Sequence, residues 1–290
     1  MYEQFYGLTE RPFRMTADPD YLYWSDMHGL AYTMLRYGVT SRAPITVITG
    51  EVGTGKTTLI RHLMNDMPAD VSVGLVSNMQ EGRGDLLDWV LLSLGETLDE
   101  RSYMVSFQRF QEAVIETYAA GKRTLLIFDE AQNMSQASLE ELRMLSNINA
   151  DKDELLQIVL VGQPELRDCL RNPEMTQMLQ RVAADYHMAA LGLEDVRGYI
   201  PHRLKVAGAS HRIFPEESCD LIHEATQGVP RLVNSLADLC LVYGYSREAQ
   251  TVEPDLVRDF LDGAEQHGIF SSFRPLERTP TLVRQRTSEA

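Results

Sequence analysis

The sequence predicts an α/β protein in which a parallel sheet, covered by helices on both faces, is followed by a small all-α domain. Up to about residue 190, short apolar runs rich in β-branched residues alternate with helical segments, as in a sheet built from crossover units. Beyond that point the segments are helical. A chain of 290 residues with 44% hydrophobic composition is long enough for two domains.

The elements follow from apolar periodicity. We expect strands in residues 44–50, 71–78, 123–132 and 154–166, and helices in 56–67, 84–98, 103–121 and 135–149. Further helices are expected in 193–208, 215–228, 230–248 and 253–266. The predicted organisation is an N-terminal segment (1–45) packing on the sheet domain, the sheet domain itself (46–190), a helical domain (191–268) and a flexible basic tail (269–290).

Composition limits the class of function. The net charge of −15, from 27 basic and 42 acidic residues, argues against a protein whose whole surface wraps nucleic acid. Three scattered cysteines without metal-ligand spacing fit a reducing cytosol. No apolar run approaches 18 residues, so we expect a cytoplasmic protein that meets the inner membrane through a partner, if at all.

A phosphate-binding motif lies between the first strand and the first helix of the sheet domain. Residues 50–57, "GEVGTGKT", match G-x-x-x-x-G-K-[ST] in the context that this motif requires. A chance glycine-rich turn is the alternative, and the strand–loop–helix context disfavours it. The fold class is therefore a P-loop NTPase, with Mg²⁺ bound by Thr57. The residues expected to bind ATP are Gly50, Glu51, Val52, Gly53, Thr54, Gly55, Lys56, Thr57 and Thr58.

Two acidic residues follow the third strand, in "TLLIFDEAQ". Asp129 is expected to reach the magnesium shell and Glu130 to polarise the attacking water, which are the groups that hydrolysis needs beside the phosphate loop. An acidic strand-to-helix cap is the alternative. Lys56 is expected to bridge the β- and γ-phosphates.

Polar residues at two other strand ends are weaker candidates. Asn78 ends the second strand, where its amide could hold Glu130 away from water until a partner binds. Gln163 ends the fourth strand and could contact the γ-phosphate or the attacking water. For each, an ordinary turn residue is the alternative.

Two arginines and one histidine complete the candidates. Arg231 in "GVPRLVN" lies in the first turn of a helix, where a cation opposes the helix dipole and favours an anionic partner. Beside the complete phosphate loop, we expect Arg231 to contact the γ-phosphate of ATP from the helical lid, with a surface arginine–glutamate pair as the alternative. Arg181 lies in "QMLQRVAADYHM", predicted as a short helical segment, and is either a finger into a neighbouring subunit or part of a local salt bridge. His28 is interpreted as locally packed, with a place near adenine as the alternative.

Together these motifs resemble an AAA+ ATPase, and more narrowly the ExeA/GspA family, over residues 1 to about 265. The resemblance rests on the motifs above, on "LVGQPEL" and on the N-terminal "MYEQFYGLTERPF". It implies a RecA-like αβα ATPase domain, a helical lid and nucleotide-dependent homo-oligomers, either rings or filaments. Secretion members continue into a transmembrane helix and a peptidoglycan-binding domain, so direct peptidoglycan remodelling is not expected here. Asp185 stands where many relatives carry a second arginine, which leaves Arg181 as the main finger candidate.

Three functions fit this site. The first is an ATP-driven switch for assembling a secretion, cell-envelope or surface-polysaccharide system through a membrane-associated protein partner. The second is a transposition regulator resembling TniB or TnsC, which forms ATP-dependent filaments on DNA. The third is a nucleotide-gated scaffold with negligible turnover. DNA contacts need clustered Lys and Arg, and apart from the tail the acidic chain offers few clusters, so we favour the first.

Overall fold

The structure, a computed structural model, describes residues 1–16, 18–77, 79, 84–97, 102–149, 154–267 and 273–274. It divides into two compact units. One unit is Met15–Leu191, and the other joins Met1–Arg14 to Gly192–Ala290. Among the described residues, no helix combines the length and apolar character needed to cross a membrane.

The first unit is built on a five-stranded parallel sheet with the order β2-β3-β4-β1-β5. Its strands are β1 (Ile45–Gly50), β2 (Val71–Val76), β3 (Arg123–Phe128), β4 (Leu156–Gly162) and β5 (Val182–Met188). Every residue of β1 and β4 is buried, as expected for central strands covered on both faces. Since the chain passes from β1 to the far edge at β2, the order reverses beside β1, where α/β sheets bind ligands.

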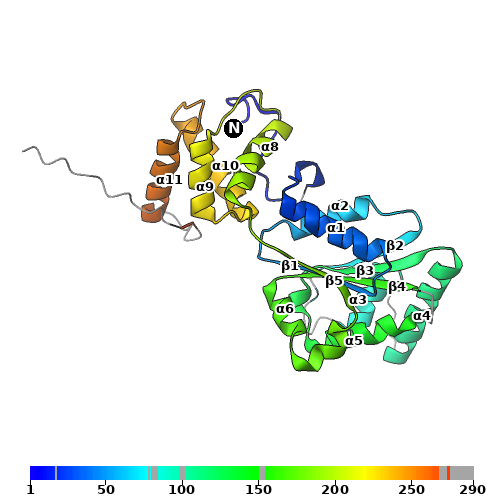
Figure 1. Cartoon of the computed structure of the whole chain (residues 1–290). Helices are drawn as coiled ribbons and strands as arrows, with labels where there is room; N and C mark the ends of the chain where they lie inside the picture. The colour runs from blue at the N-terminus through cyan, green and yellow to red at the C-terminus, as the bar shows by residue number, and fades with distance from the viewer. Residues whose placement is uncertain are drawn as a thin grey trace, which may run out of the picture. The chain divides into compact units, whose positions relative to one another are not determined.

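Helices cover both faces of this sheet (Figure 1). One face carries α1 (Asp26–Thr40) and α2 (Lys56–Asn65), with Leu35 and Leu59 fully buried. The other face carries α3 (Leu86–Ser93), α4 (Tyr103–Ala119), α5 (Gln136–Leu145) and α6 (Pro164–Leu170). The short elements of the unit are η1 (Pro19–Tyr21), η2 (Ala131–Asn133), η3 (Ser146–Ile148), η4 (Pro173–Met175) and α7 (Thr176–Leu179).

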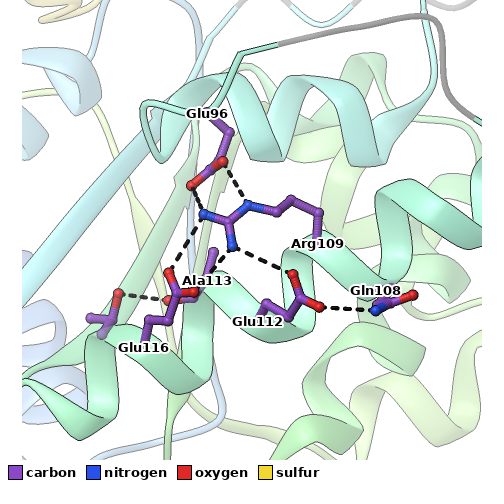
Figure 2. A network of polar contacts seen from close by, with 7 residues as sticks. Glu96, Gln108, Arg109, Glu112, Ala113 and Glu116 are labelled. Carbon is purple, nitrogen blue, oxygen red and sulfur yellow. Dashed lines mark hydrogen bonds and ion pairs between the residues drawn. The ribbon is translucent and has the colours of Figure 1, made fainter.

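A charged network joins α4 to the segment that follows α3 (Figure 2). The Arg109 guanidinium donates to both oxygens of Glu96, at 2.8 and 2.7 Å, and also meets Glu112 and Glu116 on its own helix. These hydrogen bonds, to Glu96 above all, raise the pKa of Arg109. The bidentate pair fixes the connection between the two helices that pack on β2 and β3.

The second unit contains α8 (Leu193–Val206), α9 (Glu216–Thr226), α10 (Pro230–Ser246) and α11 (Pro254–His267). Cys219 and Cys240 are free thiols buried in it. Most of the predicted tail lies outside the described residues. Within the described part, the Arg274 backbone N–H donates to the Ala225 carbonyl at 2.9 Å.

The structure corrects the predicted place of the first residues. Residues 1–14 pack with the helical unit, whereas residues 15–45 pack with the sheet. The cause is a set of buried N-terminal aromatic side chains: Tyr2, Tyr6 and Phe13 are each at most 2% exposed. The single hydrogen of the Tyr6 hydroxyl is shared between the carbonyls of Leu241 (3.3 Å) and Ala249 (3.1 Å). The chain thus begins in the helical unit, leaves it for the sheet and returns.

This packing predicts that Tyr6 stabilises the helical unit. Tyr6→Phe should lower the free energy of unfolding of that unit by about 1 kcal/mol, because two carbonyls lose their donor. Tyr6→Ala should cost about 3–5 kcal/mol by adding a cavity. Chemical denaturation followed by near-ultraviolet circular dichroism measures both. Tyr37→Phe, at a 57% exposed position in the sheet unit, is the matched control and should change nothing. Equal effects at the two positions would contradict the assignment.

Candidate nucleotide site

The phosphate loop connects β1 to α2 at the carboxyl edge of the sheet. Gly53 and Gly55 have φ angles of 84° and 97°, which residues with a Cβ rarely adopt. A Cβ at Gly55 would also lie 3.0 Å from Nε2 of His28. Glycines therefore let the loop curl ahead of the α2 N-terminus, where backbone N–H groups and the helix dipole favour a phosphate.

Lys56 is held at the base of this loop. Its ammonium donates to the carbonyls of Gly50 (2.6 Å) and Glu51 (2.9 Å), and the residue is 7% exposed. Burial lowers the pKa of Lys56, while the nearby carboxylates of Glu130 and Asp129 act in the opposite direction. The arrangement keeps a cation beside the loop, as the predicted phosphate contact requires.

Thr57 and Asp129 form the acidic side of the site. The Thr57 hydroxyl donates to Oδ2 of Asp129 at 2.9 Å, joining the first turn of α2 to the end of β3. The Asp129 backbone N–H donates to the Val76 carbonyl at 2.9 Å, which fixes the carboxylate beside the end of β2. Burial is the main cause of the raised pKa of Asp129, and the hydrogen bond from Thr57 partly offsets it.

The same pair fits a magnesium ion. Mg²⁺ in phosphate-transfer sites is held by one or two protein oxygens together with phosphate and water oxygens. Here a hydroxyl oxygen and a carboxylate oxygen already lie within hydrogen-bond distance of each other. A divalent cation would also favour the ionised form of the buried Asp129, against the effect of burial. Thr57 and Asp129 therefore stay our predicted ligands.

Glu130 begins a strained turn. Its backbone is left-handed, with φ 59° and ψ 36°, a conformation that costs a non-glycine residue roughly 1–2 kcal/mol. Its N–H donates to Oδ1 of Asp129 at 3.0 Å, which offsets part of that cost. The turn directs the Glu130 carboxylate toward the end of β4, where the Gln163 amide donates to its Oε2 at 3.4 Å. The structure thus brings Glu130 and Gln163 together.

Sequence reasoning missed Gln132, which lies between those two residues. Its amide nitrogen donates to Oε2 of Glu130 at 2.6 Å, and its amide oxygen accepts the Gln163 N–H at 2.9 Å. The available signal was the amide residue two positions after Glu130, in "DEAQ". Asn78, the predicted holder of Glu130, lies outside the described residues.

His28 also contacts the phosphate loop. The imidazole is 3% exposed, with Nε2 at 3.1 Å from the Thr54 carbonyl and Nδ1 at 2.8 Å from the Ser25 hydroxyl. A carbonyl only accepts, so Nε2 carries the proton in this contact. The local packing that we predicted therefore extends from the start of α1 to the phosphate loop.

The two arginine candidates have different surroundings. Arg181 lies in the turn between α7 and β5, and its guanidinium donates to the Ser146 and Asn147 side chains. The residues that follow it, 182–188, form β5 and not the predicted helical segment. Arg231 is exposed in the first turn of α10. It belongs to the helical unit, and its γ-phosphate contact stays a prediction.

Comparisons with known proteins identify the family of this chain. Residues 39–170 match the AAA domain family. General secretion pathway protein A of Aeromonas hydrophila is 37% identical over 253 residues, which are 87% of this chain and 46% of that protein. The chain is an ExeA/GspA-like AAA+ ATPase. It spans about half the length of this relative.

Solved structures show the same fold. The ORC2 protein of Aeropyrum pernix, in ADPNP and ADP complexes, is 17% identical with a TM-score of 0.63. The likeness covers 86% of the present chain and 70% of the ORC2 chain. Cdc6p of Pyrobaculum aerophilum is 15% identical with a TM-score of 0.63, over 81% and 66%. The RuvB branch migration motor of Thermotoga maritima is 12% identical with a TM-score of 0.52, over 84% and 70%. At these identities the likeness concerns the fold alone.

The contact between His28 and Thr54 predicts a role in nucleotide affinity. His28→Phe should weaken ATP binding about tenfold, because the buried Thr54 carbonyl loses a donor and the loop loses a support. Fluorescence titration with a labelled ATP measures the affinity. His211→Phe, at an exposed position in the helical unit, is the control. Unchanged ATP affinity in a folded His28→Phe protein would contradict this role.

Proposed function

We propose that this ATPase binds ATP with Mg²⁺ and hydrolyses it in a homo-oligomer, coupling turnover to assembly of a secretion, cell-envelope or surface-polysaccharide system. The observation that carries the proposal is the gathering of Lys56, Thr57, Asp129, Glu130 and Gln163 at one edge of the sheet. Their side chains match the parts that phosphoryl transfer to water needs.

Each group has a separate task in this proposal. The loop and Lys56 hold the phosphates, and Thr57 and Asp129 hold Mg²⁺, which when bound neutralises charge on the phosphate oxygens. Glu130 accepts a proton from the attacking water and orients it. Gln163, beside Glu130 at the end of β4, contacts the γ-phosphate or that water. Arg231 contacts the γ-phosphate from the lid.

The place of Arg181 supports action on a neighbouring subunit. Ile45 pairs with Val182 and Gly50 with Met188, so β1 and β5 run side by side from the same edge. Arg181 precedes β5, whereas the phosphate loop follows β1. A seven-residue strand is roughly 20 Å long, so Arg181 lies about that far from its own loop. A finger at this position therefore serves a nucleotide in another copy of the chain.

The partner follows from the relative. General secretion pathway protein A of Aeromonas hydrophila is a relative of this chain, and we propose that the chain likewise acts in the cytoplasm on a membrane-associated protein. The net charge of −15 supports a protein partner over DNA. DNA stays the alternative partner, and measuring ATP turnover with and without duplex DNA detects it.

The assignment of Glu130 predicts a separation of binding from chemistry. Glu130→Gln should keep ATP affinity within about twofold and lower kcat by about 100-fold or more, because the base is lost. Lys56→Ala should instead lose ATP binding. Labelled-ATP titration and phosphate release on the same preparations measure both. Normal turnover by Glu130→Gln would remove Glu130 as the base.

The oligomer predicts turnover that depends on protein concentration. The rate of ATP turnover per subunit should rise with protein concentration. Duplex DNA at physiological salt should not change this rate. Arg181→Ala should remove that rise without weakening ATP binding to the monomer, whereas Arg171→Ala, at an exposed residue after α6, should not. Full activity in a strictly monomeric preparation would contradict the finger. Strong, salt-sensitive stimulation by DNA would favour the DNA-regulator alternative.

A further inference from the structure

The side chain of Gln132 joins two parts of the site that come from different strands. Glu130 follows β3, and Gln163 follows β4. The Gln132 amide uses its two ends differently: its nitrogen donates to Oε2 of Glu130 at 2.6 Å, while its oxygen accepts the Gln163 backbone N–H at 2.9 Å. A donor and an acceptor are both needed, so a carboxylate or an apolar side chain cannot replace it.

The backbone at the end of β4 leaves room for this amide. A Cβ at Gly162 would lie 3.0 Å from Oε1 of Gln132 and 2.8 Å from Cδ2 of Leu166. A larger residue at the end of β4 would therefore push Gln132 away from the Gln163 N–H. The close approach of Gly162 is a second, independent feature that fits a fixed position for the Gln132 side chain.

The hydrogen bond from Gln132 also distinguishes the two carboxylate oxygens of Glu130. Oε2 receives the amide of Gln132 and, more weakly, that of Gln163. Among the described residues, Oε1 has no hydrogen-bond partner. The Glu130 backbone is held separately, in its left-handed turn, by Oδ1 of Asp129. Backbone and side chain are thus restrained by different neighbours.

We propose that Gln132 is a positioning residue for the general base. It holds Oε2 of Glu130 against the end of β4 and presents Oε1 to the attacking water. Because its oxygen is bound to the Gln163 backbone, a displacement of Gln163 by the terminal phosphate is passed on to Glu130. This inference rests on the proposed role of Glu130 as the base.

Two substitutions test the proposal. Gln132→Glu keeps the size and the acceptor but replaces the donor with a carboxylate next to Glu130. Like charges at that distance repel each other, so the Glu130 carboxylate should leave the end of β4 and kcat should fall about tenfold or more, with ATP affinity unchanged. Gln132→Met removes donor and acceptor, and should lower kcat about tenfold or more through misplacement of the base, without a second carboxylate.

Gln136→Glu is the matched control. Gln136 also donates its amide to a glutamate, Glu174, but does so at the surface. This variant should keep the wild-type kcat. ATP affinity should stay within about twofold in every Gln132 variant, because Lys56 and Thr57 are unchanged. The measured ATP affinity also checks that each variant is folded. If Gln132→Met loses ATP affinity, Gln132→Glu decides, since it preserves volume and acceptor.

The outcomes are distinguishable. A lower kcat at unchanged ATP affinity in both Gln132 variants, with the control unchanged, supports the proposal. A wild-type kcat in both Gln132 variants overturns it, and so does a higher kcat, which would mean that Gln132 restrains the base. Glu130→Gln is measured beside them: if it is inactive while the Gln132 variants are normal, only this inference fails. If Glu130→Gln is fully active, the proposed function fails as well.

Discussion

The hydrogen bond from Thr57 to Asp129 is the contact on which the rest of the site depends. Thr57 is in the helix that follows β1, and Asp129 follows β3, with β4 lying between the two strands. The two residues meet because all five strands are parallel, so that their carboxyl ends share one edge. Lys56 and Glu130 are the adjoining residues in sequence. A single 2.9 Å contact therefore sets the distance between the phosphate loop and the proposed base.

The helical unit depends on a different constraint, a buried polar chain at its centre. Arg203, 6% exposed, donates to the Pro12 carbonyl at 2.7 Å and to the Tyr199 hydroxyl at 2.9 Å. Tyr199 in turn donates to Asn234 at 2.9 Å. Unsatisfied buried groups are costly, so these bonds favour one arrangement of residues 1–14, α8 and α10. The N-terminal segment is consequently part of the structure of the helical unit.

The sequence predicted what local chemistry determines and missed what only tertiary packing decides. The phosphate loop and the acidic pair at Asp129 lie within short stretches whose residue types and flanking elements are diagnostic. By contrast, β5 is a partly exposed edge strand containing Asp185 and His187, so it lacks the apolar run of a central strand. The place of Tyr6 in the helical unit depends on its contact with Leu241, far along the chain. The bond between Gln132 and the Gln163 N–H likewise joins residues more than 30 positions apart. No periodicity reports such contacts.

We propose that Thr57 and Asp129 hold one Mg²⁺ together. The most direct test is a double-mutant cycle on ATP affinity, with Thr57→Ala, Asp129→Asn and both, measured with Mg²⁺ and with a chelator. Mg²⁺ should tighten ATP binding in the wild type. Each single variant should lose most of that increment, while the double variant should lose little more. Additive losses, or ATP binding that ignores Mg²⁺ in the wild type, would contradict it.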